Sequence, residues 1–386
     1  MNTDKQRKIN LQHYLDNSAT TRVSGTVSAK VSEMMTESFG NPSSLHSLGI
    51  KAENELEKSR GIIADELGVS ENEVFFTSGG TEANNLAVFG VTEWLKKRGN
   101  KIVTTAVEHS SVMEAMARLE EKGFEITYIK PDESGHFSAE QFENAIDEKT
   151  ILVSVMYVNN EVGTILPIDK IKKIIDRKKS PAVLHSDCVQ AFGKIPVKPK
   201  KLGLDIATVS GHKVHAPKGV GAIYIKKGLH PKPLLYGGEQ EKKLRPGTEA
   251  LPLIAGLGQA VSELEIGKNY DYIKSLNAYA KEKLGEIDGI SFNSPEDALP
   301  YIINFSVDGI RSETMLHFLA QREVYVSSGS ACAKGKPSHV LSAMGLNQKR
   351  ADSALRVSFS KENTEEDIDA LVEGVKEGLS SLARRK

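Results

Sequence analysis

The sequence predicts an α/β protein, with a large domain built on a mainly parallel sheet and a smaller α+β domain in its C-terminal part. Between about residues 60 and 225, short runs rich in Val, Ile and Thr alternate with longer amphipathic segments. Both faces of the short runs are mostly apolar, as in parallel strands that helices cover on each side. A chain of 386 residues is long enough to form two domains.

The first part of the chain alternates expected strands and helices. The expected strands share a high content of β-branched residues and cover residues 74–77, 101–105, 125–129, 151–155, 182–185, 206–209 and 221–225. The expected helices share an amphipathic pattern and cover residues 81–98, 110–122, 138–147 and 167–176. This alternation is typical of a layered α/β domain, in which ligands bind at the carboxyl ends of the strands.

A long helical pattern over residues 251–285 leads into the smaller domain. There we expect strands at residues 302–306, 324–326 and 354–358, and helices at residues 313–321, 338–344 and 364–383. Thr364 and Asp367 have the spacing of a capping box at the start of the last helix. We therefore expect residues 21–255 to form the large domain and residues 256–386 the small one, with residues 1–20 packing on the small domain.

The composition excludes several classes of protein. The 50 basic and 51 acidic residues nearly cancel, so no strong attraction to nucleic acid or to an anionic membrane is expected. The chain has no apolar stretch of about 18 residues and no signal-peptide core at its start. Two cysteines do not make a disulfide framework, which favours a cytoplasmic protein. No motif has the spacing of metal ligands.

Cys332 lies in an unusual setting for a cysteine. Its neighbours at residues 327–336, Ser-Ser-Gly-Ser-Ala-Cys-Ala-Lys-Gly-Lys, are small, polar or basic, so no core packs around the thiol. Nearby positive charge raises the fraction of a thiol that is ionised. The loop by itself fits either a reactive thiolate or a surface cysteine with no role. The other cysteine, Cys188, follows an apolar strand and is interpreted as a packed structural residue.

A glycine-containing turn joins the first expected strand to the first expected helix. Residues 77–84 read Thr-Ser-Gly-Gly-Thr-Glu-Ala-Asn. The two glycines let the backbone approach a ligand closely, and a helix start offers unpaired N–H groups that suit a phosphate. The alternative is an ordinary strand-to-helix turn.

Three polar side chains follow other expected strands. Asp187 comes where an apolar strand ends, and a buried carboxylate needs a cationic partner, either a protonated ring nitrogen or a nearby Lys or Arg. Lys213 follows a second apolar strand, where lost hydration makes a lysine a better nucleophile toward a carbonyl. His109 fits either a helix start or an aromatic face for a planar ligand. A phosphate cup, a carboxylate, an amine and an aromatic ring together indicate pyridoxal 5′-phosphate.

The order of these motifs strongly resembles that of the cysteine desulfurases, which belong to the class V aminotransferase group of fold type I pyridoxal-phosphate enzymes. The resemblance covers nearly the whole chain. The matching motifs lie at residues 14–21, 39–44, 77–85, 108–109, 158–161, 187, 190, 210–213, 245–248, 328–332 and 355–356. A fold type I transferase architecture is what this resemblance implies.

The resemblance also implies roles for individual residues. Lys213 would form the Schiff base and shuttle protons, and His109 would stack on the cofactor ring and assist in acid–base steps. Asp187 would hold the ring nitrogen and Gln190 the ring hydroxyl. The residues expected to bind the cofactor phosphate are Gly80, Thr81, Ser210 and His212 of the same chain and Thr248 of a neighbouring subunit, which implies a homodimer. The residues expected to bind the substrate carboxylate are Asn17, Asn160 and Arg356.

The implied reaction converts L-cysteine to L-alanine. Cys332 would take the sulfur as a persulfide and pass it to an acceptor protein that serves iron–sulfur cluster assembly or tRNA thiolation. A selenocysteine lyase or another class V aminotransferase is the alternative enzyme, although a plain aminotransferase needs no thiol. A sulfur-carrying or adaptor protein is the non-enzymatic alternative, but it has no use for Lys213 and Asp187 at strand ends.

Overall fold

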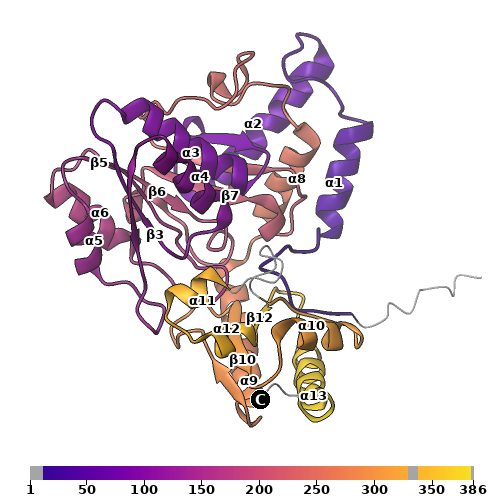
Figure 1. Ribbon diagram of the computed structural model, residues 1–386. Coiled ribbons are helices and arrows are strands. Elements are labelled where there is room, and N and C mark those ends of the chain that lie inside the picture. Colours follow the sequence, from indigo (N-terminus) through magenta and orange to yellow (C-terminus); the bar gives the residue numbers. More distant parts are fainter. Residues whose placement is uncertain (1–11, 329–337, 384–386) are drawn as a thin grey trace, which may run out of the picture. The chain divides into compact units, whose positions relative to one another are not determined.

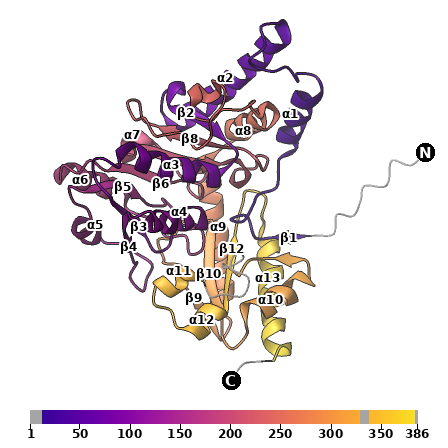
Figure 2. The ribbon, with the colours of Figure 1, turned by 45° about the horizontal axis from the view of Figure 1, so that its top comes forward.

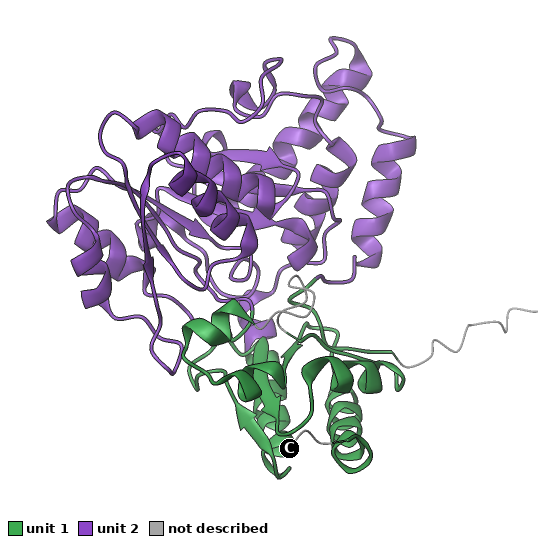
Figure 3. Ribbon diagram, in the orientation of Figure 1, with its two compact units in different colours: residues 1–19, 161–163, 271–386 green, residues 20–160, 164–270 purple. Residues whose placement is uncertain are grey.

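A computed structural model describes residues 12–328 and 338–383, and its internal contacts divide the chain into two units (Figure 3). The larger unit comprises residues 20–160 and 164–270, and the smaller unit comprises residues 1–19, 161–163 and 271–386. The division follows residue 270 and not residue 255, because α8 (Leu251–Ser262) packs against α1 (Gly25–Thr36) and α2 (Ser47–Leu67) of the larger unit. In the described residues, no helix is long and apolar enough to cross a membrane.

A seven-stranded sheet forms the centre of the larger unit, with the strand order β2-β8-β7-β6-β5-β3-β4. Its strands are β2 (Val74–Thr77), β3 (Lys101–Thr105), β4 (Glu125–Ile129), β5 (Thr150–Ser154), β6 (Val183–Asp187), β7 (Ile206–Ser210) and β8 (Gly221–Ile225). These bounds agree with the expected strands to within two residues. The strands from β7 to β4 are parallel, as expected, whereas β8 is antiparallel to both of its neighbours. The short connection from β7 to β8 contains no crossover helix, so the chain reverses direction there.

Helices pack against this sheet (Figure 1). They are α3 (Gly80–Leu95), α4 (Ser110–Glu121), α5 (Ala139–Ala145), α6 (Ile168–Arg177) and the short α7 (Pro199–Leu202). α3 contacts β2 and the strands from β5 to β8, and α4 lies beside α3. Buried aliphatic side chains from α3, α4 and the strands form one continuous core. Burial of this apolar surface is the main force that holds α3 at the sheet, and α3 begins where β2 ends.

Two helices near the start of the chain were not among the expected elements. α1 and α2 precede the region in which strands and helices alternate. A helical signal is nevertheless present in α2, since Ala52, Leu56, Ser59, Ile63 and Leu67 are buried at spacings of three or four residues. Both helices pack on α8.

The smaller unit contains two small sheets (Figure 2). One is antiparallel, with the order β12 (Ala354–Ser358), β10 (Ile302–Val307) and β9 (Ile290–Phe292); the other is a parallel pair of β1 (His13–Tyr14) with β11 (Val324–Tyr325). Its helices after residue 271 are α10 (Ser312–Ala320), α11 (His339–Ala343), α12 (Gln348–Asp352) and α13 (Glu365–Ser381). The capping box of Thr364 and Asp367 at the start of α13 is confirmed.

The single long helix expected over residues 251–285 is instead two helices. α8 ends at Ser262 and α9 (Ile266–Gly285) begins after a break. Glu263 is the C-cap of α8, and its carboxylate accepts hydrogen bonds from Ser24 and Thr26 just before and within the first turn of α1. The helical periodicity of the sequence did not reveal this break. The break is accompanied by the contact of Glu263 with Ser24 and Thr26, which are distant in the sequence.

Candidate active site

Glycine residues bring the start of α3 against its neighbours. Gly79 is the N-cap of α3 and has φ 150°, a conformation that side chains rarely adopt. A Cβ atom placed on Gly80 would lie 3.0 Å from Val189 Cγ2 and 3.5 Å from Ser210 Cβ. A Cβ on Gly221 would lie only 2.8 Å from Gly79 Cα. The turn after β2, the end of β7 and the start of β8 therefore form one closely packed cup at the N-terminus of α3.

Asp187 lies at the end of β6 and is 6% exposed. Its Oδ1 accepts a hydrogen bond from the Val189 N–H at 2.9 Å, and its Oδ2 accepts one from Asn84 Nδ2 at 2.6 Å. Across the two described segments of the chain, no lysine or arginine forms an ion pair with Asp187. The alternative of a Lys or Arg partner is therefore not observed, and the buried carboxylate fits a protonated ring nitrogen.

Asn84 begins a hydrogen-bonded chain that joins Asp187 to His109. Asn84 Nδ2 also donates to Ser111 Oγ at 2.9 Å, and Ser111 Oγ lies 2.9 Å from His109 Nδ1. The Ser111 N–H donates to the same His109 nitrogen at 3.2 Å. His109 Nδ1 is therefore an acceptor, which leaves the ring proton on Nε2. On the other side, Thr208 Oγ1 donates to Asn84 Oδ1 at 2.5 Å and fixes the orientation of the amide.

His109 is the N-cap of α4, so the helix-start interpretation is confirmed, while its stacking role stays a prediction. The adjacent Glu108 has no exposed surface, and its Oε1 accepts hydrogen bonds from Thr105 Oγ1 at 2.6 Å and from the Met156 N–H at 2.9 Å. Burial raises the pKa of Glu108 to about 8, and the nearby charge of Asp187 adds to this shift. Glu108 therefore holds a proton near neutral pH. Asn84 and Glu108 were not predicted to have a role, although both lie within the motifs at residues 77–85 and 108–109.

Lys213 and His212 occupy a 3₁₀ turn, η2 (Gly211–Lys213), directly after β7. Burial lowers the pKa of His212 to about 4, and nearby positive charge, above all that of Lys213, lowers it further. His212 is therefore neutral near pH 7, with its Nδ1 3.3 Å from Thr20 Oγ1.

A buried amide–amine pair follows β6. Gln190 and Lys194 are both about 5% exposed, and Lys194 Nζ donates to Gln190 Oε1 at 2.6 Å. Ser210, at the end of β7, is also buried. Thr81 lies in the first turn of α3, and Thr248 is exposed in the segment before α8.

The residues expected to bind the substrate carboxylate are divided between the units. Arg356 and Asn17 belong to the smaller unit, and Asn160 belongs to the larger one. Arg356 is 4% exposed, and its Nη2 forms an ion pair with Asp16 at 2.7 Å. Asn17 Nδ2 donates to the Ser358 carbonyl at 2.9 Å.

Of the two cysteines, the structure describes Cys188. Cys332 lies outside the described residues. Cys188 is fully buried, and burial raises the pKa of its thiol, which confirms the structural interpretation of this residue.

These residues fit pyridoxal 5′-phosphate. The cup offers hydroxyl groups and helix N–H groups for a phosphate, Asp187 provides a buried anion, and Lys213 provides an amine in the same unit. In the described parts of the chain, no group of three or more His, Cys, Asp or Glu side chains could hold a metal ion.

The comparisons with known proteins identify the family of the chain. The family model of the class-V aminotransferases matches residues 13–371, so the chain belongs to this family. Cysteine desulfurase IscS of Methanosarcina thermophila is 41% identical over 374 residues, which cover 96% of this chain and 92% of the relative. A putative cysteine desulfurase IscS 1 of Bacillus subtilis is 42% identical over 378 residues, covering 96% of this chain and 99% of the relative.

Solved structures give the same result for the fold. A NifS-like protein is 40% identical and superposes with a TM-score of 0.91, covering 96% of this chain and 99% of that protein. SspA, solved in complex with cysteine, is 34% identical with a TM-score of 0.81, covering 91% of this chain and 99% of that protein. The chain therefore has the fold type I architecture of pyridoxal-phosphate transferases, as expected from its motifs.

Proposed function

We propose that this chain is a pyridoxal-phosphate-dependent cysteine desulfurase that converts L-cysteine to L-alanine and transfers the sulfur to Cys332. The observation that carries the proposal is the buried Asp187 carboxylate, which accepts hydrogen bonds from Asn84 and the Val189 N–H and lies in the same unit as Lys213 and the cup. The relatives named as cysteine desulfurases support the choice of substrate and reaction.

When bound at the cup, Asp187 and Lys213, the cofactor would supply an aldehyde that is reactive toward amines and a ring that can accept electrons. Asp187 would stabilise positive charge at the ring nitrogen, because opposite charges attract strongly in a buried site. Lys213 provides the amine that removes the α-proton and later returns a proton. His109 carries its ring proton on Nε2, so this nitrogen can donate in the acid–base steps.

Substrate orientation and sulfur transfer complete the reaction. The Arg356 guanidinium binds the cysteine carboxylate with help from Asn17 and Asn160, because its planar fork matches a carboxylate. The Cys332 thiolate attacks the substrate sulfur. The S–S bond forms as the substrate C–S bond breaks, and the carbon keeps the electron pair, takes up protons and leaves as alanine.

Further parts of the proposal concern assembly, acceptor and location. A homodimer, with Thr248 reaching the neighbouring subunit, is supported by large exposed apolar side chains such as Phe39 (65% exposed), Leu45 (97%) and Tyr236 (86%). The persulfide is passed to an acceptor protein in the cytoplasm, for iron–sulfur cluster assembly or for tRNA thiolation.

Paired substitutions test this function. Purified wild type and variants are incubated with L-cysteine and a thiol reductant, and alanine and sulfide are quantified. We expect Lys213→Ala to lose both the visible absorbance of bound cofactor and all turnover. Cys332→Ala should keep the absorbance and lose sulfide release. Cys188→Ala is the matched control, since this thiol is buried. Full sulfide production by Cys332→Ala would overturn the persulfide assignment.

A further inference from the structure

Three consecutive non-glycine residues have left-handed backbone conformations in the segment that precedes α8. They are Glu241 (φ 46°), Lys242 (φ 55°) and Lys243 (φ 68°), at a 3₁₀ turn, η3 (Gln240–Lys243). Side chains rarely adopt this conformation, and a run of three is strained. Such strain persists only where surrounding contacts hold the segment in place, and it is found at sites where a precise geometry is needed.

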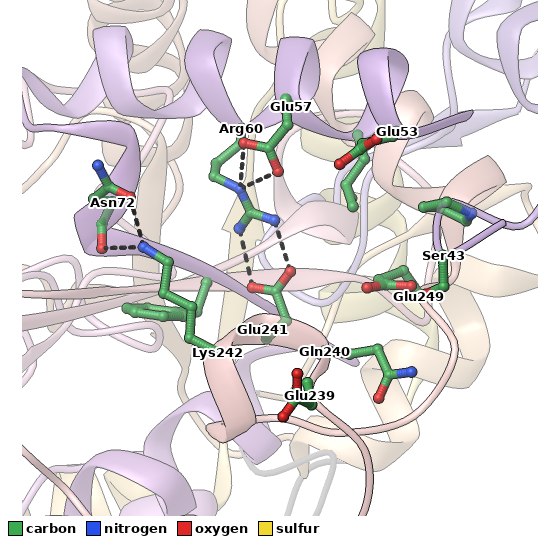
Figure 4. Close-up of a pocket in the computed structure, with 13 residues that line it drawn as sticks. Ser43, Glu53, Glu57, Arg60, Asn72, Glu239, Gln240, Glu241, Lys242 and Glu249 are labelled. Carbon is green, nitrogen blue, oxygen red and sulfur yellow. Dashed lines mark hydrogen bonds and ion pairs between the residues drawn. The ribbon is translucent and has the colours of Figure 1, made fainter. Parts of the chain in front are cut away.

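One set of contacts that holds this segment is made by the carboxylate of Glu241 (Figure 4). Its two oxygens accept hydrogen bonds from Arg60 Nη1 at 3.0 Å and from Arg60 Nη2 at 2.8 Å. The oxygen Oε2 also accepts from the Phe76 N–H at 2.8 Å. The Glu241 side chain is 2% exposed, so these bonds are shielded from water.

The pair of Arg60 and Glu241 takes the place of a neighbouring strand. β2 is an edge strand of the seven-stranded sheet, so among the described residues one side of it has no strand partner. On that side Glu241 accepts from the Phe76 N–H and Arg60 Nη1 donates to the Val74 carbonyl at 2.9 Å. The guanidinium also lies 4.9 Å from the centre of the Phe76 ring. This satisfies edge groups that would otherwise be open to water.

A second connection runs from the same segment to the cup. Arg245 Nε donates to Glu82 Oε1 at 3.0 Å, and Glu82 Oε2 accepts a hydrogen bond from the Ser78 N–H at 2.9 Å. Within the segment, the Gly247 N–H donates to Gln240 Oε1 at 3.1 Å and closes the loop. The segment is thus tied to β2 just before the cup and to α3 just after it.

We propose that Glu241 and Arg245 are positioning residues, which brace the phosphate cup by anchoring the segment of residues 241–247 to β2 through Glu241 and to α3 through Arg245. This inference rests on the proposed use of pyridoxal 5′-phosphate and adds two residues outside the cofactor pocket on which phosphate affinity depends. The carboxylate satisfies three N–H donors from two elements. A neutral amide at this position loses the ion pair and has a single acceptor oxygen.

The test compares two ligands, pyridoxal 5′-phosphate and pyridoxal, which lacks the phosphate. Dissociation constants of both are measured by absorbance titration of cofactor-free protein. We expect Glu241→Gln to weaken binding of pyridoxal 5′-phosphate about tenfold or more, the size of one charge-assisted hydrogen bond, and to leave pyridoxal binding within about twofold. Arg245→Gln, which breaks the second connection, should show the same selective loss.

The control is Glu239→Gln, which alters an exposed carboxylate two positions away that pairs with Lys243 at the surface. It should change neither dissociation constant. Thermal denaturation of each cofactor-free variant checks that the variant folds. If Glu241→Gln does not fold, Arg245→Gln is used for the test. Equal losses for both ligands, or an unchanged ratio in the folded variants, would overturn the inference. A wild type that binds neither ligand would instead overturn the proposed function.

Discussion

Replacing Gly221 with alanine is expected to destabilise the larger unit and to distort the cup. Gly221 begins β8, and its Cα faces the turn after β2. An added Cβ would lie 2.7 Å from the Val209 carbonyl oxygen, 2.8 Å from Gly79 Cα and 2.9 Å from Gly79 C. All three are backbone atoms, so no side-chain rotation can relieve the overlap, and β8 or the cup must move.

The size of the effect follows from these contacts. Overpacking in a well-packed interior costs about 1–3 kcal/mol, and three simultaneous backbone overlaps place Gly221→Ala at the upper end, about 3 kcal/mol. For a unit of this size, each kcal/mol lowers the melting temperature by roughly 2–4 °C. We therefore expect a decrease of about 6–12 °C. The affinity for pyridoxal 5′-phosphate should fall as well, because Gly79 is displaced.

Thermal denaturation of cofactor-free protein, followed by circular dichroism, measures the change. The matched control is Gly267→Ala in α9, where an added Cβ has no atom within 4 Å. Alanine favours a helix over glycine by up to about 1 kcal/mol, so the control should be neutral or slightly stabilising. A Gly221→Ala protein that melts within about 2 °C of wild type would refute the packing argument.

Three further predictions concern charge. Glu108→Gln keeps the acceptor for both hydrogen bonds but cannot ionise. Since the pKa of Glu108 is raised from 4.5 to about 8 in the folded protein, the wild type should lose stability as the pH rises through this range, and the variant should lose less. Urea denaturation at several pH values measures this, and identical profiles for the two proteins would contradict the raised pKa. Asn84→Asp places a second carboxylate beside Asp187, which raises the pKa of the pair, so this variant should be less stable at mildly alkaline than at acidic pH; equal stability at both would count against it. Arg356→Ala should raise the KM for L-cysteine about 10- to 100-fold, the size of a charge-assisted bond, and an unchanged KM would remove Arg356 from the carboxylate site.

The strands of the large sheet were predictable because their signal is local. β2, β3, β4 and β8 have the predicted bounds, since each is a short apolar run rich in β-branched residues or bounded by turn residues. The reversed direction of β8 was not predicted, because an apolar pattern is the same in parallel and antiparallel strands. The break between α8 and α9 was missed because the helical pattern of the sequence continues across it.

The positions of the candidate site residues in the fold were predictable where these residues lie in one motif. The turn at residues 77–84, the carboxylate at the end of β6 and the lysine after β7 were all identified from strand ends. The importance of Asn84 and Glu108 was not, although both lie in these motifs. The role of Asn84 depends on contacts with Asp187, Thr208 and Ser111, all from other elements, and the raised pKa of Glu108 depends on complete burial.

The amino-acid sequence alone determined which segments become strands and helices, where glycines let the backbone turn, and which family the motifs resemble. These properties depend on residues only a few positions apart. The tertiary structure decided the direction of β8, the link between Asn84 and Asp187, and the pairing of Arg60 with Glu241 at the edge of the sheet. Such contacts join residues that are far apart in the chain, so they exist only after packing of the core has brought separate elements together.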